Sequence, residues 1–374
     1  IGFRRRGVAG HLHHRRRSHR LAAKQKGKRQ QGQAEGAGEP PYRFAAGVGT
    51  CHPRRVPQSA SGRLAQTATS GLTVSILAPR AQGTVTLNDG RRLGYAEYGV
   101  PAGRPVLWFH GTPGARRQLT PRSCDVAAEL GIRIVMPERP GIGASTPHLY
   151  AQIVDWAGDM AQLTRTLGID EFAAMGLSGG GPYVLACAHE MPERVVMGAP
   201  LGSVAPSIGS EAPQGGIVSL LRRLSPAIAL CRGPLGSGLS RLVVQLEPFA
   251  DQAMDLFMLT MPPGDRRVFS DPGTREVFQQ DLVIGNREGG MQAMFNDMVL
   301  FGRPWGFSLR NISVPIRFWH GDADNLVPLA HAEHMASLLA DAQILVRPQE
   351  GHLGGLSAAE EVFHAILQHW PNST

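Results

Sequence analysis

Short apolar runs alternate with helix-like segments along the chain from about residue 84. The stretch at 104–111, RPVLWFHG, is almost continuously apolar, which is typical of a strand buried on both faces of a sheet. Further periodic segments predict strands at 132–138, 171–178, 194–203, 315–321 and 342–348, and helices at 115–130, 150–167, 179–189, 329–340 and 358–369. This alternation predicts right-handed βαβ units. We therefore expect an α/β fold with a mostly parallel, doubly wound sheet that carries helices on both faces.

Two segments depart from this alternation. The residues GTVTLNDGRRLGYAEYG, at 83–99, predict a hairpin of two strands around the turn Asn88-Asp89-Gly90. Residues 207–312 read as several helices with Pro and Gly breaks, inserted between two core strands. We therefore expect a core built from 84–206 and 313–374, with 207–312 forming a helical cap.

One helix face of the expected cap is rich in methionine. Met291, Met294, Phe295 and Met298 follow the spacing i, i+3, i+4, i+7, which places them on one side of a helix. The pattern favours packing inside the cap. The alternative is that some of these flexible thioethers line an apolar pocket.

Basic residues are concentrated at the beginning of the sequence. Residues 1–80 hold 16 Lys and Arg against 2 Asp and Glu, whereas 81–374 hold the remaining 22 against 28. The body is therefore mildly acidic, which argues against nucleic-acid binding by the folded domain. Residues 1–72 lack apolar periodicity and predict a basic, disordered tail. Since the first methionine is Met136, we expect this tail to lie upstream of the natural start, near Leu72 or Val74.

Composition removes several classes of chemistry. All three lysines lie in the basic tail, which excludes Schiff-base chemistry, a Ser–Lys dyad and a P-loop from the body. The four cysteines are scattered without a C-x-x-C pair, which favours reduced thiols in a cytoplasmic protein. No run reaches the ~18 apolar residues of a membrane span. His331 and His334 lack a partner carboxylate, so we interpret them as helix surface and expect neither a metal nor a cofactor.

The candidate chemistry falls where predicted strands end. His110-Gly111-Thr112, Ser178 and Asp324 each follow an apolar run, and ligands of parallel sheets bind beyond the carboxyl ends of the strands. Ser178 lies between glycines, at the change from a strand pattern to a helix pattern. We therefore expect these segments to meet at one edge of the sheet.

Five motifs occur in a characteristic order. They are HGTPG at 110–114, ERPGIGAS at 138–145, GLSGG at 176–180, HGDADNLVP at 320–328 and EGHL at 350–353. In this order they resemble the α/β-hydrolase superfamily, in particular the capped single-chain serine hydrolases of its esterase and proline-iminopeptidase-like branch. The resemblance covers about 84–370. It implies Ser178 as the nucleophile, Asp324 as the acid and His352 as the base, with Asp322 as the runner-up acid.

Each implied role has a physical reason. A serine hydroxyl is weakly nucleophilic until a histidine takes its proton, and a buried carboxylate then fixes and stabilises that histidine. The resemblance also implies that the backbone N–H groups of Thr112 and Gly179 form an oxyanion hole. His110 is expected to fix the turn rather than to act in catalysis. Arg139 is expected to anchor its loop through a carboxylate.

Two further arginines and three acidic residues leave alternatives open. Arg116 and Arg117 favour either a solvated helix start or an anionic substrate group. Acidic side chains that share one helical face in the cap favour a solvated face or the binding of a substrate amine; they are Glu247, Asp251 and Asp255.

The resemblance implies a serine hydrolase that acts by acyl transfer on a small-molecule substrate. A mainly apolar ester of small to medium size fits the many apolar residues of the expected cap. The alternatives are a proline-iminopeptidase-like aminopeptidase, a hydrolase of carbon–carbon bonds, and a ligand receptor on the same fold. Haloalkane dehalogenases and epoxide hydrolases are disfavoured because they carry Asp at the position of Ser178. The oligomeric state stays open.

Overall fold

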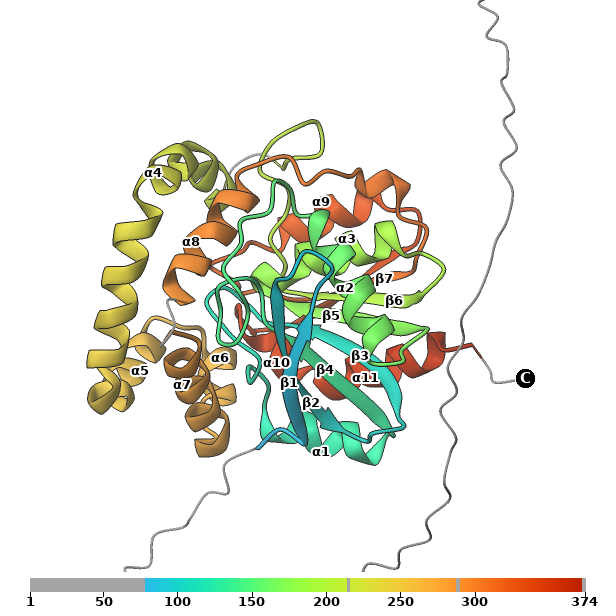
Figure 1. The fold of residues 1–374 in the computed structure, drawn as a ribbon, viewed down its shortest axis with the longest axis horizontal. Helices are drawn as coiled ribbons and strands as arrows, with labels where there is room; N and C mark the ends of the chain where they lie inside the picture. Colours follow the sequence, from blue (N-terminus) through green and yellow to red (C-terminus); the bar gives the residue numbers. More distant parts are fainter. Residues whose placement is uncertain (1–77, 214–215, 287–289, 372–374) are drawn as a thin grey trace, which may run out of the picture. The chain divides into compact units, whose positions relative to one another are not determined.

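The computed structural model describes residues 78–213, 216–286 and 290–371 (Figure 1). The tail and the start expected near residue 72 lie outside these residues. Eight strands form one sheet: β1 (Ala81–Thr86), β2 (Arg92–Gly99), β3 (Arg104–Phe109), β4 (Ile132–Pro137), β5 (Phe172–Leu177), β6 (Val195–Leu201), β7 (Ile316–Gly321) and β8 (Ala342–Arg347). All eight lie within a few residues of the strands predicted from the sequence.

The sheet has the order β1-β2-β4-β3-β5-β6-β7-β8. β2 pairs antiparallel with β1 and with β4, and every other neighbouring pair is parallel. This confirms the prediction of a mostly parallel α/β sheet. Because β3, β5 and β7 run in the same direction, the loops that follow them gather at one edge of the sheet.

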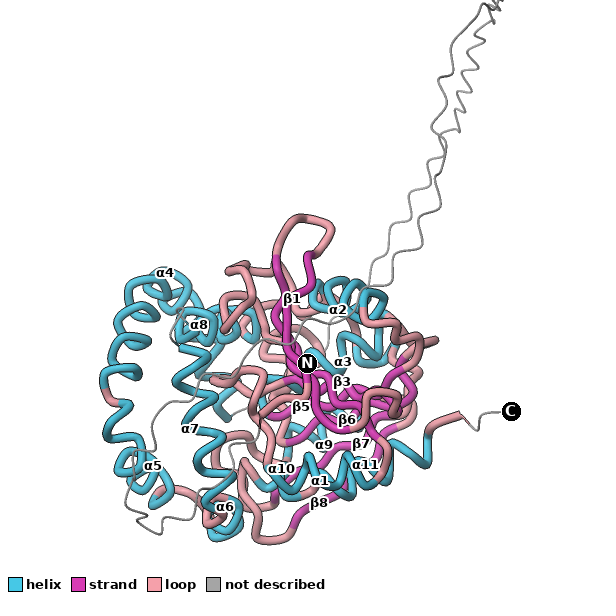
Figure 2. The backbone as a smooth tube through the Cα atoms, turned by 60° about the horizontal axis from the view of Figure 1, so that its bottom comes forward, coloured by secondary structure: helices cyan, strands magenta, loops and turns pink. Residues whose placement is uncertain are grey.

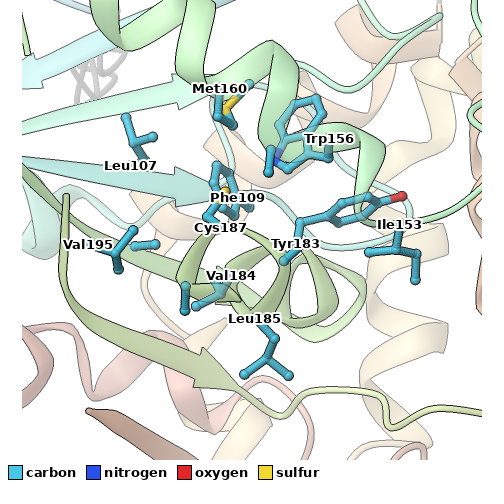
Figure 3. Packing of buried hydrophobic residues seen from close by; sticks show 14 of the residues in the cluster. Leu107, Phe109, Ile153, Trp156, Met160, Tyr183, Val184, Leu185, Cys187 and Val195 are labelled. Carbon is cyan, nitrogen blue, oxygen red and sulfur yellow. The ribbon is translucent and has the colours of Figure 1, made fainter. Parts of the chain in front are cut away.

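Helices cover both faces of the sheet (Figures 1 and 2). On one face lie α1 (Pro121–Glu129), α10 (Gly354–Ser357) and α11 (Ala359–His369), and on the other lie α2 (Asp155–Thr166), α3 (Gly181–Glu190) and α9 (Ala330–Leu338). Figure 3 shows the second layer, where Trp156 packs edge-on against Phe109 and Tyr183. Aromatic packing of this kind fixes α2 and α3 against β3.

The helix predicted at 115–130 begins later than expected. α1 starts at Pro121, where the Thr120 hydroxyl accepts a hydrogen bond from the Ser123 N–H and caps the helix. The backbone N–H groups of Ala115 and Arg117 bond instead to the carboxylate of Asp281, so this stretch forms a loop.

Among the described residues between β6 and β7, five α-helices occur, and we call them the inserted helices. They are α4 (Gly216–Gln245), α5 (Ala250–Leu259), α6 (Pro263–Val268), α7 (Pro272–Asn286) and α8 (Gly290–Phe301), with a short 3-10 turn, η2 (Glu247–Phe249), between the first two. A second such turn, η3 (Leu309–Asn311), precedes β7. The prediction of Pro breaks was wrong in α4, which continues through Pro226 and Pro234. Within the described ranges, no helix combines the length and apolarity needed to cross a membrane.

The packing around Trp156 gives a stability prediction. Trp156 is fully buried, and its truncation to alanine opens a large cavity beside Phe109 and Tyr183. We expect Trp156→Ala to lower the free energy of unfolding by about 3–5 kcal/mol in urea titrations followed by circular dichroism. Val346→Ala, on the exposed side of β8, is the control and should change it by less than about 0.5 kcal/mol. Equal effects in the two variants would contradict the packing described.

Candidate functional site

Ser178 occupies a strained turn between β5 and α3. Its φ angle is +52°, in the left-handed region that costs energy for any residue with a side chain. The glycines beside it are required by space: a Cβ on Gly176 would lie 2.6 Å from the Gly180 carbonyl oxygen. A Cβ on Gly180 would lie 2.4 Å from the Phe109 carbonyl oxygen at the end of β3. The turn therefore projects the serine hydroxyl beyond the edge of the sheet.

Ser178, His352 and Asp324 meet at that edge. The Oγ of Ser178 lies 2.8 Å from Nε2 of His352, and Nδ1 of His352 lies 2.8 Å from Oδ2 of Asp324. This arrangement fits the tautomer in which Nδ1–H donates to the carboxylate and Nε2 accepts from the serine hydroxyl. The structure thus brings together the three side chains that the sequence places up to 174 residues apart.

The Asp324 carboxylate is buried and fully bonded. Oδ1 accepts hydrogen bonds from the N–H groups of Leu326 and Val327, each at 2.8 Å. Nε2 of His320 lies 3.4 Å from Oδ2 and donates to the Val327 carbonyl at 2.7 Å. Burial by itself raises the pKa of Asp324, but the bonds from His320 and His352 outweigh it and hold that pKa well below its usual range. The carboxylate therefore stays charged beside His352.

Asp322, the runner-up acid, points elsewhere. Its Oδ1 accepts a hydrogen bond from the Gln349 N–H at 2.7 Å, and its side chain is exposed. Gln349 has a φ of +61°, so this bond secures a strained position in the loop that leads to His352. Asp324 is the carboxylate that faces the histidine.

The turn after β3 approaches Ser178 closely. A Cβ on Gly179 would lie 2.4 Å from Oγ1 of Thr112 and 2.9 Å from the ring of Phe301. Gly179 also lies at the beginning of a helical turn, where backbone N–H groups lack intrahelical partners. The two residues implied as oxyanion donors, Gly179 next to Ser178 in the chain and Thr112 in the turn after β3, therefore lie in close contact.

A buried arginine and an aspartate from α8 hold the Thr112 turn. Arg139 donates to the carbonyls of His110 and Gly111 at 2.6 and 2.8 Å, and to Asp297 at 2.9 Å. Thr112 Oγ1 accepts from Arg139 and donates to Asp297, each at 2.8 Å. The Tyr183 hydroxyl donates to the other carboxylate oxygen of Asp297 at 2.8 Å. Arg139 thus meets the carboxylate expected from the sequence, and an inserted helix supplies it.

His110 lies inside this network and does not reach Ser178. Its Nδ1 lies 2.8 Å from the Gly111 carbonyl, and its Nε2 accepts from the Arg139 N–H at 3.3 Å. Burial and the charge of Arg139 place the pKa of His110 well below its usual value. A neutral ring matches both bonds. Arg116, which we considered for substrate binding, pairs instead with Glu138 at 2.7 Å.

Asp265 of α6 holds the loop that carries His352. Its Oδ1 accepts hydrogen bonds from the N–H groups of Gly351 and Leu353, each at 3.1 Å, on both sides of the histidine. The side chain is fully buried, and Oδ2 has no hydrogen-bond partner among the described residues. Burial raises the pKa of Asp265, although the two N–H bonds and the nearby His352 act in the opposite direction.

Asp281 of α7 makes a similar contact with the segment after the Thr112 turn. Its two carboxylate oxygens accept the N–H groups of Ala115 and Arg117 at 2.7 and 2.8 Å. Burial raises the pKa of Asp281 to about 7, against the opposing effect of these bonds. Three buried aspartates of the inserted helices therefore hold loops of the core.

A cavity of about 530 Å³ opens onto Ser178 and His352. Most of its apolar lining comes from the segment between β6 and β7, including Met254, Phe257, Phe269 and Phe278. Thr112, Gln118, Glu247, Gln279 and Asp281 supply its other polar groups. The cavity is the size of a small-ligand site with an apolar lining.

Two expectations about the inserted helices can now be compared with the structure. Of the three acidic residues expected on one helical face, Asp251 and Asp255 form ion pairs with Arg275 and do not line the cavity, whereas Glu247 lines it. The methionine face of α8 also takes no part in the cavity wall, and Met291 is buried in packing.

The interpretation of His331 as helix surface was wrong. His331 is buried, and His334 is half-buried with its Nε2 2.9 Å from the Glu211 carbonyl. His331 lies close enough to His320 and Asp324 to interact with both electrostatically. Over the part of the chain that the structure describes, no group of three or more His, Cys, Asp or Glu is arranged to hold a metal ion.

Sequence reasoning missed five residues around this site, namely Gln118, Asp265, Asp281, Asp297 and His320. Gln118 holds the Thr112 turn by accepting from the Gly111 N–H and donating to the Pro113 carbonyl. For Asp281 and Asp297, the available signal was an acidic residue within an apolar-rich helical stretch, as in MFNDMVLF around Asp297. A carboxylate in such a stretch is costly unless it is paired.

The alpha/beta hydrolase family model matches residues 106–365. A non-heme haloperoxidase of Rhodococcus erythropolis is 26% identical over 277 residues, which cover 72% of this chain and 92% of the relative. A proline iminopeptidase of Xanthomonas citri is 34% identical over 119 residues, which cover 30% of this chain and 37% of the relative. A solved structure of a thermophilic esterase from Thermogutta terrifontis superposes with a TM-score of 0.54 at 22% identity, covering 77% of this chain and 97% of that one.

The Asp265 contact predicts different effects for two substitutions. Asp265→Ala leaves the N–H groups of Gly351 and Leu353 buried without an acceptor, so we expect it to lower the free energy of unfolding by about 1–3 kcal/mol. Asp265→Asn keeps an oxygen that can accept both bonds, so it should lose less stability than Asp265→Ala at neutral pH. Chemical denaturation measures both. A loss as large in Asn as in Ala would contradict the bonding described.

The raised pKa of Asp281 predicts a pH dependence of stability. The unfolded pKa of aspartate is about 3.9, so between that pH and about 7 the folded chain keeps a proton that the unfolded chain has lost. The contribution of Asp281 to stability is therefore greatest below pH ~4 and is lost as the pH rises towards 7. Asp281→Asn has no group that ionises at this position, so we expect its free energy of unfolding to fall less steeply with pH over this range. Chemical denaturation at a series of pH values measures this. Parallel profiles for the two proteins would show that Asp281 does not titrate there.

Proposed function

Because the chain belongs to the alpha/beta hydrolase family, we propose that it is a serine hydrolase that acts by acyl transfer on a mainly apolar ester. The observation that carries this proposal is the chain of hydrogen bonds from Ser178 through His352 to Asp324, at the wall of an apolar cavity. A nucleophile, a base and an orienting carboxylate in this geometry are the parts that acyl transfer requires.

In the first half of the proposed reaction, Oγ of Ser178 attacks the ester carbonyl carbon and gives its proton to Nε2 of His352. The charge of Asp324 stabilises the imidazolium that forms. The negative charge on the carbonyl oxygen develops between the N–H groups of Thr112 and Gly179, which we assign as the oxyanion hole. The Arg139–Asp297 pair keeps the Thr112 turn in place for this role.

The tetrahedral intermediate then collapses, and His352 returns the proton to the departing alkoxide. An alcohol leaves and the acyl group stays on Ser178. In the second half, His352 takes a proton from a water molecule as its oxygen attacks the acyl carbonyl. Collapse of this second intermediate returns the proton to Ser178 and releases the carboxylic acid.

The cavity supports an ester with an apolar acyl or alcohol part. Its wall offers aromatic, methionine and leucine side chains, which bind hydrocarbon, beside the acidic side chains of Glu247 and Asp281. An aminopeptidase would hold the substrate amine with carboxylates at the cavity. Of the three acidic residues that the sequence offers for this purpose, Asp251 and Asp255 pair with Arg275 and do not line the cavity, whereas Glu247 does line it.

The proposed triad gives a direct prediction for activity. Ser178→Ala should lower kcat for p-nitrophenyl butyrate by about a million-fold, and it should abolish labelling by a fluorophosphonate probe. Asp324→Asn should lower kcat by about ten-thousand-fold, since the histidine then loses its orienting charge. Asp322→Asn is the matched control, and its loss should be far smaller because Asp322 faces Gln349.

A series of p-nitrophenyl esters, from acetate to laurate, tests the substrate class. We expect kcat/KM to rise from acetate to a medium-length acyl chain as more hydrocarbon enters the cavity. Full fluorophosphonate labelling without hydrolysis of any ester would keep Ser178 as the nucleophile and shift the substrate to amides or carbon–carbon bonds. Neither labelling nor hydrolysis, in a folded protein, would overturn the proposed function.

A further inference from the structure

Large apolar side chains are exposed on one part of the inserted helices. Among the described residues, nearly all of the exposed large apolar side chains belong to residues 224–259, in α4, η2 and α5. The most exposed are Leu230 at 84%, Leu259 at 74% and Leu256 at 67%. A concentration of this kind marks an interaction surface in a folded protein. We call it the α4–α5 surface, and Figures 1 and 2 show both helices at the same edge of the molecule.

This surface is continuous with the mouth of the cavity. Leu246 and Phe257 are exposed on the α4–α5 surface and also line the cavity that leads to Ser178. Leu326, beside the loop of Asp324, is likewise both exposed and part of the cavity wall. An apolar molecule on this surface therefore has an apolar path to the serine.

The charges along the surface favour an anionic partner. The α4 sequence contains four arginines and no acidic residue, and the side chains of Arg223 and Arg241 are exposed. The surface also carries three acidic residues, of which Glu247 is exposed in η2, while Asp251 and Asp255 of α5 pair with Arg275 of α7. A helix that carries exposed leucines and arginines without acidic residues is typical of segments that lie on anionic lipid.

We infer that the α4–α5 surface docks on an anionic lipid surface, and that the enzyme takes apolar esters from that surface into the cavity. The inference deepens the proposed function and rests on it for the ester. A second copy of the chain is the competing occupant of the surface. It would cover Leu246, Phe257 and Leu326 and so close the entrance to the cavity, whereas a lipid surface supplies apolar substrates to that entrance.

The test uses the full chain with Ser178→Ala, so that binding is measured without turnover. We expect it to co-float with vesicles of phosphatidylglycerol and phosphatidylcholine, and to float much less with phosphatidylcholine alone. The double variant Leu256→Ser, Leu259→Ser in the same background should partition at least about tenfold more weakly, because two leucine side chains no longer enter the apolar phase. Val346→Ser, on β8, is the matched control and should bind normally.

The basic residues before residue 80 attract anionic vesicles by themselves, and the double variant separates the two contributions. Binding that is unchanged in Leu256→Ser, Leu259→Ser would overturn the inference, because the basic residues before residue 80 would then account for it alone. Light scattering compares the oligomeric states of the two proteins. A dimeric wild type and a monomeric Leu256→Ser, Leu259→Ser variant would overturn the inference in favour of a second copy of the chain.

Hydrolysis by the wild type then separates this inference from the proposed function. If the wild type hydrolyses p-nitrophenyl butyrate in free solution but Ser178→Ala does not bind vesicles, only the inference of lipid docking is overturned. If the protein binds vesicles but hydrolyses no ester, the proposed function is overturned, and so is the ester substrate assigned to the docked enzyme. The expected result is hydrolysis of a long-chain ester that increases when it is presented in anionic vesicles, with the increase lost in Leu256→Ser, Leu259→Ser.

Discussion

Buried carboxylates of the inserted helices hold the loops on which the proposed chemistry depends. Asp265 binds the loop around His352, Asp281 binds the segment after the Thr112 turn, and Asp297 binds the turn through Arg139. Removing an ionised carboxylate from water costs several kcal/mol unless donors replace the water. In the fold these donors are backbone N–H groups and a guanidinium of the core, so the inserted helices and the core loops stabilise each other.

The site therefore has two origins. The strained turn of Ser178 comes from the core alone, because glycines at 176 and 180 let β5 and α3 pass close to β3. The loop of His352 and the Thr112 turn belong to the core, but aspartates of the inserted helices hold them in place. Of the helices that carry these aspartates, α7 also lines the cavity, so changes in α7 that reshape the cavity also act on the segment after the Thr112 turn, which Asp281 holds. We therefore expect substitutions in α6, α7 and α8 to affect the geometry of the site as well as the helices themselves.

Much of this could be predicted from the sequence, and the reason is geometric. Parallel strands deliver their carboxyl ends to one edge, so Ser178 and Asp324 were expected to meet because each follows an apolar strand. The aspartates of the inserted helices could not be placed in the same way. Asp297 and Arg139 are 158 residues apart, and neither helical periodicity nor local spacing identifies such a partner. His331 shows the converse error: a polar residue on a helix predicts exposure, but packing buried its ring near His320 and Asp324.

The exposure of the cysteines has a practical consequence. Burial raises the pKa of the Cys124 thiol to about 12 and that of Cys187 further still, so neither reacts readily with electrophiles. Cys231 is exposed in α4, next to Leu230. With Cys51 replaced by serine, because it lies outside the described residues, a maleimide dye would attach at Cys231 alone. A polarity-sensitive fluorophore at that position would report the surroundings of α4 directly, without any substitution in the inserted helices.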